Sequence, residues 1–199
     1  MSGQPTEPGA PGRRDDADSP PAAGQTEQRH AALLHGRAWT FGDDVSTDHI
    51  APGRLFHLRT DLPELAKHVL EDENPEFAKR LKAGDFVVGG RNFGLGSSRE
   101  HAPRIIKLAG AGAVLAQSFA RIFFRNAINV GLPALVCDTS AIEQWDDLEV
   151  DLAAGEVRDL TSGATVPFVP LPPVMLRILS DGGLVAHLRK YGEFHLPGA

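Results

Sequence analysis

Residues 85–109 place a short apolar run, a glycine-rich loop and an amphipathic stretch in that order, and this order strongly limits the folds open to the chain. The run over 85–88 predicts a short buried strand, and apolar residues recur at helical spacing beyond Pro103. Proline is tolerated only in the first turn of a helix, so the helix should begin near Arg99 or Glu100. Residues 85–109 therefore predict a strand, a loop and a helix.

The same alternation continues on both sides of this unit. The spacing of apolar residues predicts, in chain order, a strand over 37–41, a helix over 62–70, a strand over 113–117, a helix capped by Ser118 and running to Asn129, and a strand over 132–137. Residues 148–152 and 156–160 alternate as a hairpin, and two more helices should flank Gly182 and Gly183, the last ending near Lys190. This order predicts the α/β class with some antiparallel pairing.

The first thirty residues differ sharply in composition from the rest of the chain. They contain five prolines and four glycines but no Leu, Ile, Val, Phe, Trp or Tyr, so burial cannot offset the entropy of ordering them. We therefore expect a disordered tail over 1–30 and one folded domain over 31–199. Arg13 and Arg14 are followed by acidic residues instead of an apolar export segment, and no apolar run approaches the ~18 residues that span a bilayer. Both observations predict a cytoplasmic protein without a membrane segment.

Charge and cysteine content argue against two further kinds of site. A formal net charge of −6 and an isoelectric point near 5.7 disfavour a nucleic-acid-binding surface, which normally needs a basic face. An iron–sulfur cluster needs three or four thiolates, and Cys137 is the single cysteine of the sequence. The chain alone should therefore bind no cluster and no other metal. Cys137 ends an apolar run, which predicts a buried structural thiol.

The glycine-rich loop places two hydroxyls and a guanidinium at the mouth of the predicted helix, on Ser97, Ser98 and Arg99. Free backbone N–H groups and the positive end of the helix dipole face the same space, which favours an anion. The loop lacks the third glycine of a dinucleotide fingerprint and the lysine of a phosphate loop, so a carboxylate substrate fits better than a phosphate chain. The alternative is a loop with a capping box, because Ser97 and Glu100 have the S-x-x-E spacing.

Three segments, 42–50, 94–102 and 118–126, resemble the motifs of the aconitase superfamily and follow the same order along the chain. The resemblance extends over about 36–191, and within the superfamily it is to the small, cluster-free subunits of two-chain dehydratases. It implies a swivelling β/β/α domain that closes over a partner's active site. Leu95 departs from the pattern, since many small subunits carry cysteine there and aconitases often carry glutamate.

The resemblance also implies an activity, which is removal of water from a small branched hydroxy acid and its return at the neighbouring carbon. Conversion of 2-isopropylmalate to 3-isopropylmalate is the leading example. The 4Fe-4S cluster that assists this chemistry as a Lewis acid would belong to a large subunit, in a heterodimer or heterotetramer. By motif position, Ser97 would be the base, as an alkoxide, while Ser98 and Arg99 would assist it and bind a substrate carboxylate.

Thr47 and Asp48 match a second active-site element of the family. Asp48 would orient a histidine of the large subunit, and Thr47 and Gly96 would lie against the substrate. Local chemistry alone favours a turn for this segment, because it is rich in Asp and Ser. His49 and His101 are expected to be structural residues that brace these loops.

Residues 55–60 occupy the position at which the family reads the variable part of its substrates. Leu55, Phe56 and Leu58 could accept an alkyl group, and Arg59 could grip a carboxylate or remain solvated before a helix. Homoaconitase-like and 2,3-dimethylmalate-type dehydratases share these motifs and stay open as alternatives. An RNA-binding or regulatory swivel domain without catalysis is the contrasting class.

Two further arginines belong to the third motif. Arg121 and Arg125 are four residues apart on the predicted helix, so they share one of its faces. We expect a structural or interface role for both, in preference to catalysis.

Overall fold

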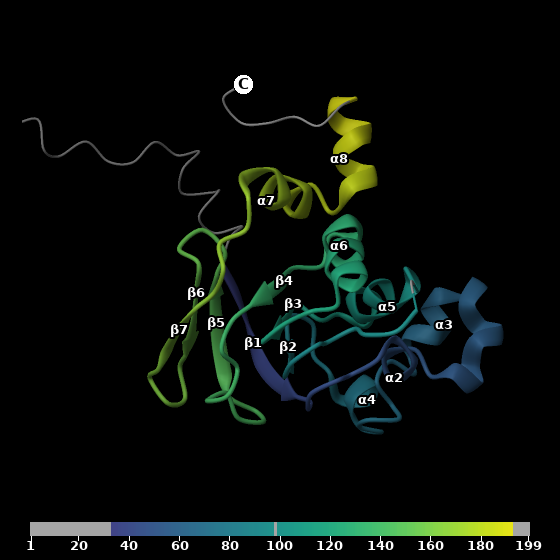
Figure 1. Ribbon diagram of the computed structural model, residues 1–199, viewed down its shortest axis with the longest axis horizontal. Helices are drawn as coiled ribbons and strands as arrows, with labels where there is room; N and C mark the ends of the chain where they lie inside the picture. The colour runs from purple at the N-terminus through teal and green to yellow at the C-terminus, as the bar shows by residue number, and fades with distance from the viewer. Residues whose placement is uncertain (1–32, 98, 193–199) are drawn as a thin grey trace, which may run out of the picture.

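The computed structural model describes residues 33–97 and 99–192, and its strands form one seven-stranded sheet in the order β4-β3-β2-β1-β5-β6-β7 (Figure 1). β1 (Leu33–Thr40) lies in the centre of this sheet. It pairs in parallel with β2 (Phe86–Gly89) and antiparallel with β5 (Asp147–Asp151). β1 therefore divides the sheet into a parallel half and an antiparallel half.

The parallel half consists of β1, β2, β3 (Ala113–Ala116) and β4 (Ala134–Val136). Parallel neighbours need long crossover connections, and helices supply them here. The connection between β1 and β2 contains α2 (Thr47–Ile50), η1 (Gly53–Thr60), α3 (Leu62–Ala66) and α4 (Phe77–Arg80). α5 (His101–Ala109) joins β2 to β3, and α6 (Arg121–Val130) joins β3 to β4. The loops that leave β1, β2 and β3 consequently meet at one edge of the sheet.

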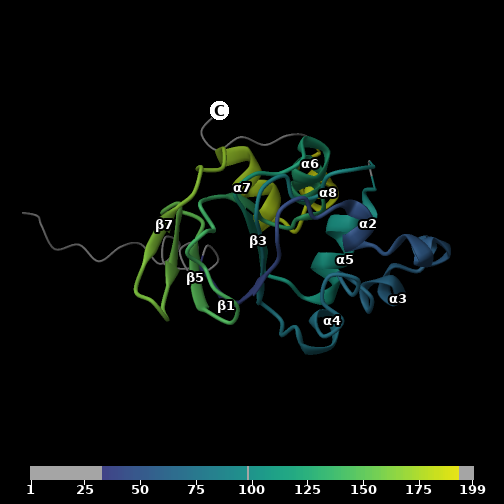
Figure 2. The same cartoon turned by 60° about the horizontal axis from the view of Figure 1, so that its bottom comes forward.

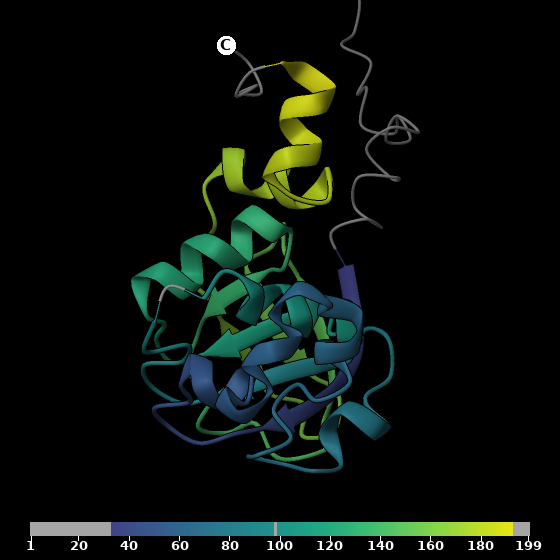
Figure 3. The ribbon, with the colours of Figure 1, turned by 90° about the vertical axis from the view of Figure 1, so that its right-hand side faces the viewer.

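The antiparallel half continues from β5 through two hairpins to β6 (Glu156–Asp159) and β7 (Thr165–Pro167). The chain then returns to the parallel half as α7 (Pro173–Ser180) and α8 (Leu184–Tyr191), and both helices contact α6. Figure 2 shows α6, α7 and α8 grouped together, away from α3 and α4. In Figure 3 the yellow helices α7 and α8 lie above α6.

Both faces of the parallel half are buried, as expected when crossover helices cover a parallel sheet. Alternate residues of β2 belong to two separate apolar clusters, with Val87 in one and Phe86 and Val88 in the other. Successive side chains of a strand point to opposite faces, so the two clusters lie on opposite sides of the sheet. Leu65 of α3 and Ile105 of α5 belong to the first cluster, and the second includes residues of α7.

Most of the predicted elements are confirmed, and the α/β class with antiparallel pairing is correct. The bounds of two strands differ, since β1 begins at Leu33 and β4 covers only Ala134–Val136. Two helix predictions are also wrong in detail. The predicted helix over 62–70 ends as α3 at Ala66, and the following turns leave Leu70 with a φ of 56°, which an α-helix does not allow. Ser118 does not cap α6, which begins only at Arg121, because the Ser118 hydroxyl accepts a hydrogen bond from the backbone N–H of Asn92 instead.

The predicted tail over 1–30 lies outside the described residues. Within 33–97 and 99–192, no helix has the length and apolar composition needed to cross a membrane.

Candidate active site

Backbone hydrogen bonds tie together the three loops that follow β1, β2 and β3. Gly94 donates its N–H to the carbonyl of Val45 at 2.7 Å, and Thr47 donates to the carbonyl of Leu95 at 2.8 Å. The β3 loop joins them, because Ala120 donates to the carbonyl of Phe93, in the β2 loop, at 2.9 Å. The carboxyl ends of parallel strands are the usual ligand-binding edge of an α/β sheet. The three motifs of the sequence therefore meet where a site is expected.

Two glycines allow these loops to approach closely. Gly94 has a φ of +79°, and a Cβ at this position would overlap the ring of Phe123 on α6. Gly96 has a φ of +108°, and a Cβ there would lie 3.1 Å from Oγ1 of Thr47. L-residues with a side chain rarely adopt such φ values, so both positions favour glycine. The loop thus fits between α2 and α6.

A capping box at the start of α2 fixes the orientation of Thr47 and Asp48. His49 donates its N–H to Oγ of Ser46 at 3.1 Å, and Ser46 donates its N–H to Nδ1 of His49 at 3.3 Å. Nδ1 of His49 also lies 2.9 Å from Oε1 of Glu73, so this ring nitrogen accepts from Ser46 when unprotonated and donates to Glu73 when protonated. His49 thus braces the start of α2, and the segment is a capped helical turn.

The loop after β2 meets α2 through two side-chain contacts. Oγ of Ser97 lies 3.4 Å from Oγ1 of Thr47, a side chain whose residue is only 2% exposed. Arg99 forms an ion pair with Asp48 through Nη1, and the same nitrogen lies 3.4 Å from the carbonyl oxygen of Ala51. The structure thus brings together Thr47, Asp48, Ser97 and Arg99 of the predicted site, while Ser98 lies outside the described residues.

The capping-box alternative for Ser97 and Glu100 is wrong. Glu100 itself occupies the N-cap position of α5, and no side chain caps that end of the helix. Pro103 falls in the first turn, as the sequence predicts. His101 begins the helix, and its pKa is lowered by burial and by the neighbouring cation of Arg99, so the neutral imidazole is favoured.

The predicted specificity segment lies within η1, and two guanidiniums lie near the ring of Phe56. The Arg59 guanidinium lies 4.4 Å from the centre of the Phe56 ring, and that of Arg99 lies 5.8 Å from it. Phe56 is 50% exposed, whereas Leu55 and Leu58 pack partly against the core. Phe56 is consequently the apolar residue of this segment that is most available to a ligand.

The described part of the chain does not fit a metal or an iron–sulfur cluster. It contains no group of three or more His, Cys, Asp or Glu residues that could hold an ion. Cys137 is 6% exposed, and burial, with a smaller effect of Asp138, raises the pKa of its thiol to about 12. The prediction of a buried structural thiol is confirmed, and the raised pKa keeps this thiol protonated at neutral pH.

The structure adds two features to the predicted site. The carbonyl of Ala51 accepts from Arg99, a contact with no sequence signal because every residue carries a carbonyl. A pocket of about 490 Å³ also adjoins the loop, and its walls include Gly94, Gly96, Arg121 and Arg125. The spacing of the two arginines indicated their shared face, but only the fold places that face beside the loop.

Known proteins resemble this chain over most of its length. The Aconitase C-terminal domain family matches residues 57–139. The chain is 59% identical to 3-isopropylmalate dehydratase small subunit 2 of Archaeoglobus fulgidus, over 81% of this chain and 98% of that protein. It is 56% identical to 3-isopropylmalate dehydratase small subunit 1 of Thermotoga maritima, over 81% of this chain and 98% of that protein. It is 52% identical to the methanogen homoaconitase small subunit of Methanothermobacter thermautotrophicus, over 79% of this chain and 92% of that protein. The crystal structure of 3-isopropylmalate dehydratase (leuD) from Methanocaldococcus jannaschii superimposes with a TM-score of 0.77 at 44% identity, over 80% of this chain and 95% of that one.

Proposed function

The chain belongs to the small-subunit family of 3-isopropylmalate dehydratases within the aconitase superfamily, and we propose that its enzyme isomerises 2-isopropylmalate to 3-isopropylmalate by dehydration and rehydration. The observation that carries this proposal is the meeting of Ser97 with Thr47 and of Arg99 with Asp48 across two loops. It provides a hydroxyl, a cation and a carboxylate in one place, at the ligand-binding edge of the sheet. The relatives at 59% and 56% identity support the same activity.

In this proposal Ser97 removes the proton from the carbon next to the one that loses the hydroxyl. A serine hydroxyl is a very weak acid, so this role needs strong activation. Arg99 lies two residues after Ser97 in the same loop and supplies a cation. Oγ1 of Thr47 lies 3.4 Å from Oγ of Ser97, so the Thr47 hydroxyl can donate a hydrogen bond to an alkoxide on Ser97. Exclusion of water by a docked partner would strengthen both interactions.

Arg99 would bind a carboxylate of the substrate with the donors that remain to it. A guanidinium has five N–H donors, and the contacts to Asp48 and Ala51 both use Nη1. Nη2 and Nε have no partner among the described residues, and the side chain is 21% exposed. Ser98 belongs to the proposed site by its motif position.

Asp48 would serve a group of the large subunit. One of its carboxylate oxygens pairs with Arg99, and the side chain is 55% exposed, so the other oxygen is open to a partner. We propose that it orients a histidine of that subunit. Gly96 and Thr47 would contact the substrate from the loop side, where the absence of a Cβ on Gly96 leaves space.

The identity of the acid depends on η1 in this proposal. Phe56, with Leu55 and Leu58 behind it, would accept the isopropyl group, while Arg59 has no carboxylate partner among the described residues and is available to a substrate. Homoaconitate is the second candidate, because a methanogen homoaconitase small subunit is 52% identical to this chain. 2,3-Dimethylmalate remains a third, since its small branched chain would fit the same apolar side.

The large subunit would carry the 4Fe-4S cluster, because the residues of this chain do not fit one. We place the assembly in the cytoplasm, as a heterodimer or heterotetramer. Reconstitution of the purified chain with its large subunit tests the whole proposal. The pair should convert 2-isopropylmalate with a higher kcat/KM than homoaconitate or 2,3-dimethylmalate, and the small chain alone should be inactive. Preference for another acid would contradict the substrate assignment, and activity of the isolated chain would contradict the shared site.

A further inference from the structure

α6 presents two guanidiniums that the proposed chemistry does not use. Arg121 and Arg125 are exposed and lie one helical turn apart, and neither has a carboxylate or aromatic partner among the described residues. Among the described residues, Arg54, Arg91 and Arg158, by contrast, each form an ion pair. α6 therefore presents two cations on one face that are available to a ligand.

The two arginines are part of a concave surface and do not project from a flat one. The pocket of about 490 Å³ is lined by both of them together with Ala120, Ile122, Gly94 and Gly96. Ile122 is 41% exposed and adds an apolar side chain next to the cations. Arginine beside a desolvated apolar contact is typical of the residues that dominate protein–protein binding.

The pocket is continuous with the candidate active site. Gly96, which lines it, precedes Ser97, whose hydroxyl contacts Thr47. A subunit that completes the active site around Ser97 must cover this loop, and its surface then reaches the pocket. Ser97 and Arg99 contact α2, whereas Arg121, Ile122 and Arg125, which supply the large side chains of the pocket, belong to α6, and this favours a protein contact there over the substrate.

We propose that Arg121 and Arg125 bind acidic side chains of the large subunit and that Ile122 packs against an apolar residue beside them. This inference rests on the proposed function, since it requires a large subunit that faces Ser97. The guanidiniums match carboxylates bidentately and are free to do so. They guide the encounter of the two subunits and seal the edge of the site.

Calorimetric titration of the purified large subunit into the full-length chain tests the proposal. The double variant Arg121→Glu/Arg125→Glu should weaken association at least ~10-fold, and the wild-type affinity should fall with added salt more steeply than that of Arg121→Ala/Arg125→Ala. Arg189→Glu is the matched control, because Arg189 on α8 is also exposed and has no partner among the described residues. Its affinity should stay within about twofold of wild type. Thermal unfolding of each chain alone verifies that the variants fold. If Arg121→Glu/Arg125→Glu does not fold, the affinity of Arg121→Ala/Arg125→Ala is compared with that of Arg189→Glu instead.

Two outcomes would overturn the proposal. One is an affinity of the folded double variants equal to that of Arg189→Glu. The other is unchanged affinity with a raised KM at saturating large subunit, which would assign the pocket to a substrate carboxylate. The titration needs no substrate. If the proposed substrate is wrong, the measured subunit affinities therefore stay the same, and only the activity assays change.

Discussion

The antiparallel and parallel halves of the sheet use their polar side chains differently. In the antiparallel half, Arg158 donates to Glu149 at 2.5 Å and to Glu156 at 2.8 Å. The carboxylate of Asp159, which is 3% exposed, accepts the N–H groups of Thr161 and Ser162 at 2.8 and 3.1 Å. These charges are bound to the strands and turns of their own half.

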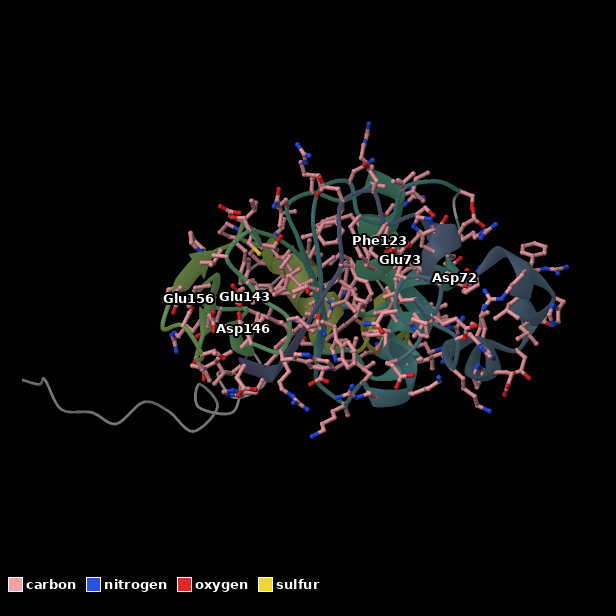
Figure 4. All side chains as sticks on the ribbon, turned by 90° about the horizontal axis from the view of Figure 1, so that it is seen from below. Asp72, Glu73, Phe123, Glu143, Asp146 and Glu156 are labelled. Atoms are coloured by element: carbon pink, nitrogen blue, oxygen red, sulfur yellow. The ribbon has the colours of Figure 1, made fainter. Side chains whose placement is uncertain are left out.

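In the parallel half, several polar groups at the loop edge have capacity left for a ligand. Asp48 is half exposed with one ion pair, Arg99 has unused donors, and Arg121 and Arg125 have no carboxylate partner among the described residues. In Figure 4, Glu143, Asp146 and Glu156 lie on the side of the antiparallel strands, and Phe123, Glu73 and Asp72 lie toward the helices of the parallel half. In one sheet, the antiparallel half thus pairs its polar groups internally, whereas the loop edge of the parallel half keeps polar groups available for binding.

The sharpest test compares hydroxyls from the two halves. Ser97→Ala should reduce turnover by about 10³-fold, as expected for loss of a general base, with little change in stability because the side chain is exposed. Ser162→Ala is the matched control, since its hydroxyl donates to Asp159 within the antiparallel half. It should lower the melting temperature and spare turnover. Steady-state kinetics of the reconstituted pair and thermal unfolding measure both effects, and a reversed pattern would remove Ser97 from the chemistry.

A second test compares carboxylates. Asp48→Asn should lower turnover about 10²-fold, and it should cost less than ~1 kcal/mol of stability because its ion pair is exposed. The affinity for the large subunit, measured in the same titration, distinguishes lost assembly from lost chemistry. If turnover stays within twofold of wild type, Asp48 is an ordinary turn residue.

Asp159→Asn should show the opposite behaviour, with normal turnover and about 1–2 kcal/mol of lost stability. Burial alone would raise the pKa of Asp159, but hydrogen bonds from Ser162 and Thr161 outweigh it and hold the pKa below its ordinary value of 3.8. The carboxylate therefore stabilises the fold above about pH 3.8, and this contribution is lost as pH falls through the lowered pKa. Denaturant unfolding at pH 7 and pH 3 should show a smaller difference between variant and wild type at the lower pH. An equal difference at both would exclude the carboxylate as the cause.

The sequence predicted the elements whose apolar pattern is local. The run 85–88 and the hairpin of β5 and β6 are in place because alternation and burial follow from neighbouring residues. η1 and β7 were not predicted, since η1 buries no side chain completely and β7 is only three residues long. Such elements are stabilised by tertiary contacts, which the sequence does not display.

The site was predictable to the extent that its residues lie within motifs. The resemblance assigned Ser97, Arg99 and Asp48, and the structure brings these positions together. The contacts of Phe56 with Arg59 and Arg99 could not be predicted, because the contact with Arg99 depends on how η1 lies against the loop after β2.

Arg59 tests whether the open edge also selects the substrate. Arg59→Ala should weaken every candidate acid by about 1.5–3 kcal/mol if the guanidinium grips a carboxylate that all of them share. If Arg59 instead binds a distal carboxylate that only homoaconitate carries, Arg59→Ala should weaken the binding of homoaconitate strongly and leave that of isopropylmalate unchanged. KM and kcat for isopropylmalate, dimethylmalate and homoaconitate separate the two cases. A variant unchanged on all three would leave Phe56, Leu55 and Leu58 as the specificity residues.

Substitution of Cys137 should have the smallest effect on activity, and it checks how far the open loop edge of the parallel half extends. It follows β4 at the same edge as the active loops, yet it is 6% exposed and burial raises its pKa to about 12. The native thiol should therefore resist alkylation at pH 8 until the chain unfolds, and Cys137→Ala should leave kcat/KM unchanged.

A raised thiol pKa stabilises the fold below the ordinary value of 9.0, and this contribution is lost as pH rises from 9.0 toward about 12. Unfolding at pH 8 and pH 10.5 should consequently show a larger loss of stability in the wild type than in Cys137→Ala. Rapid stoichiometric labelling of the folded chain at pH 8 would instead show that the thiol is accessible, and that the open edge extends to β4.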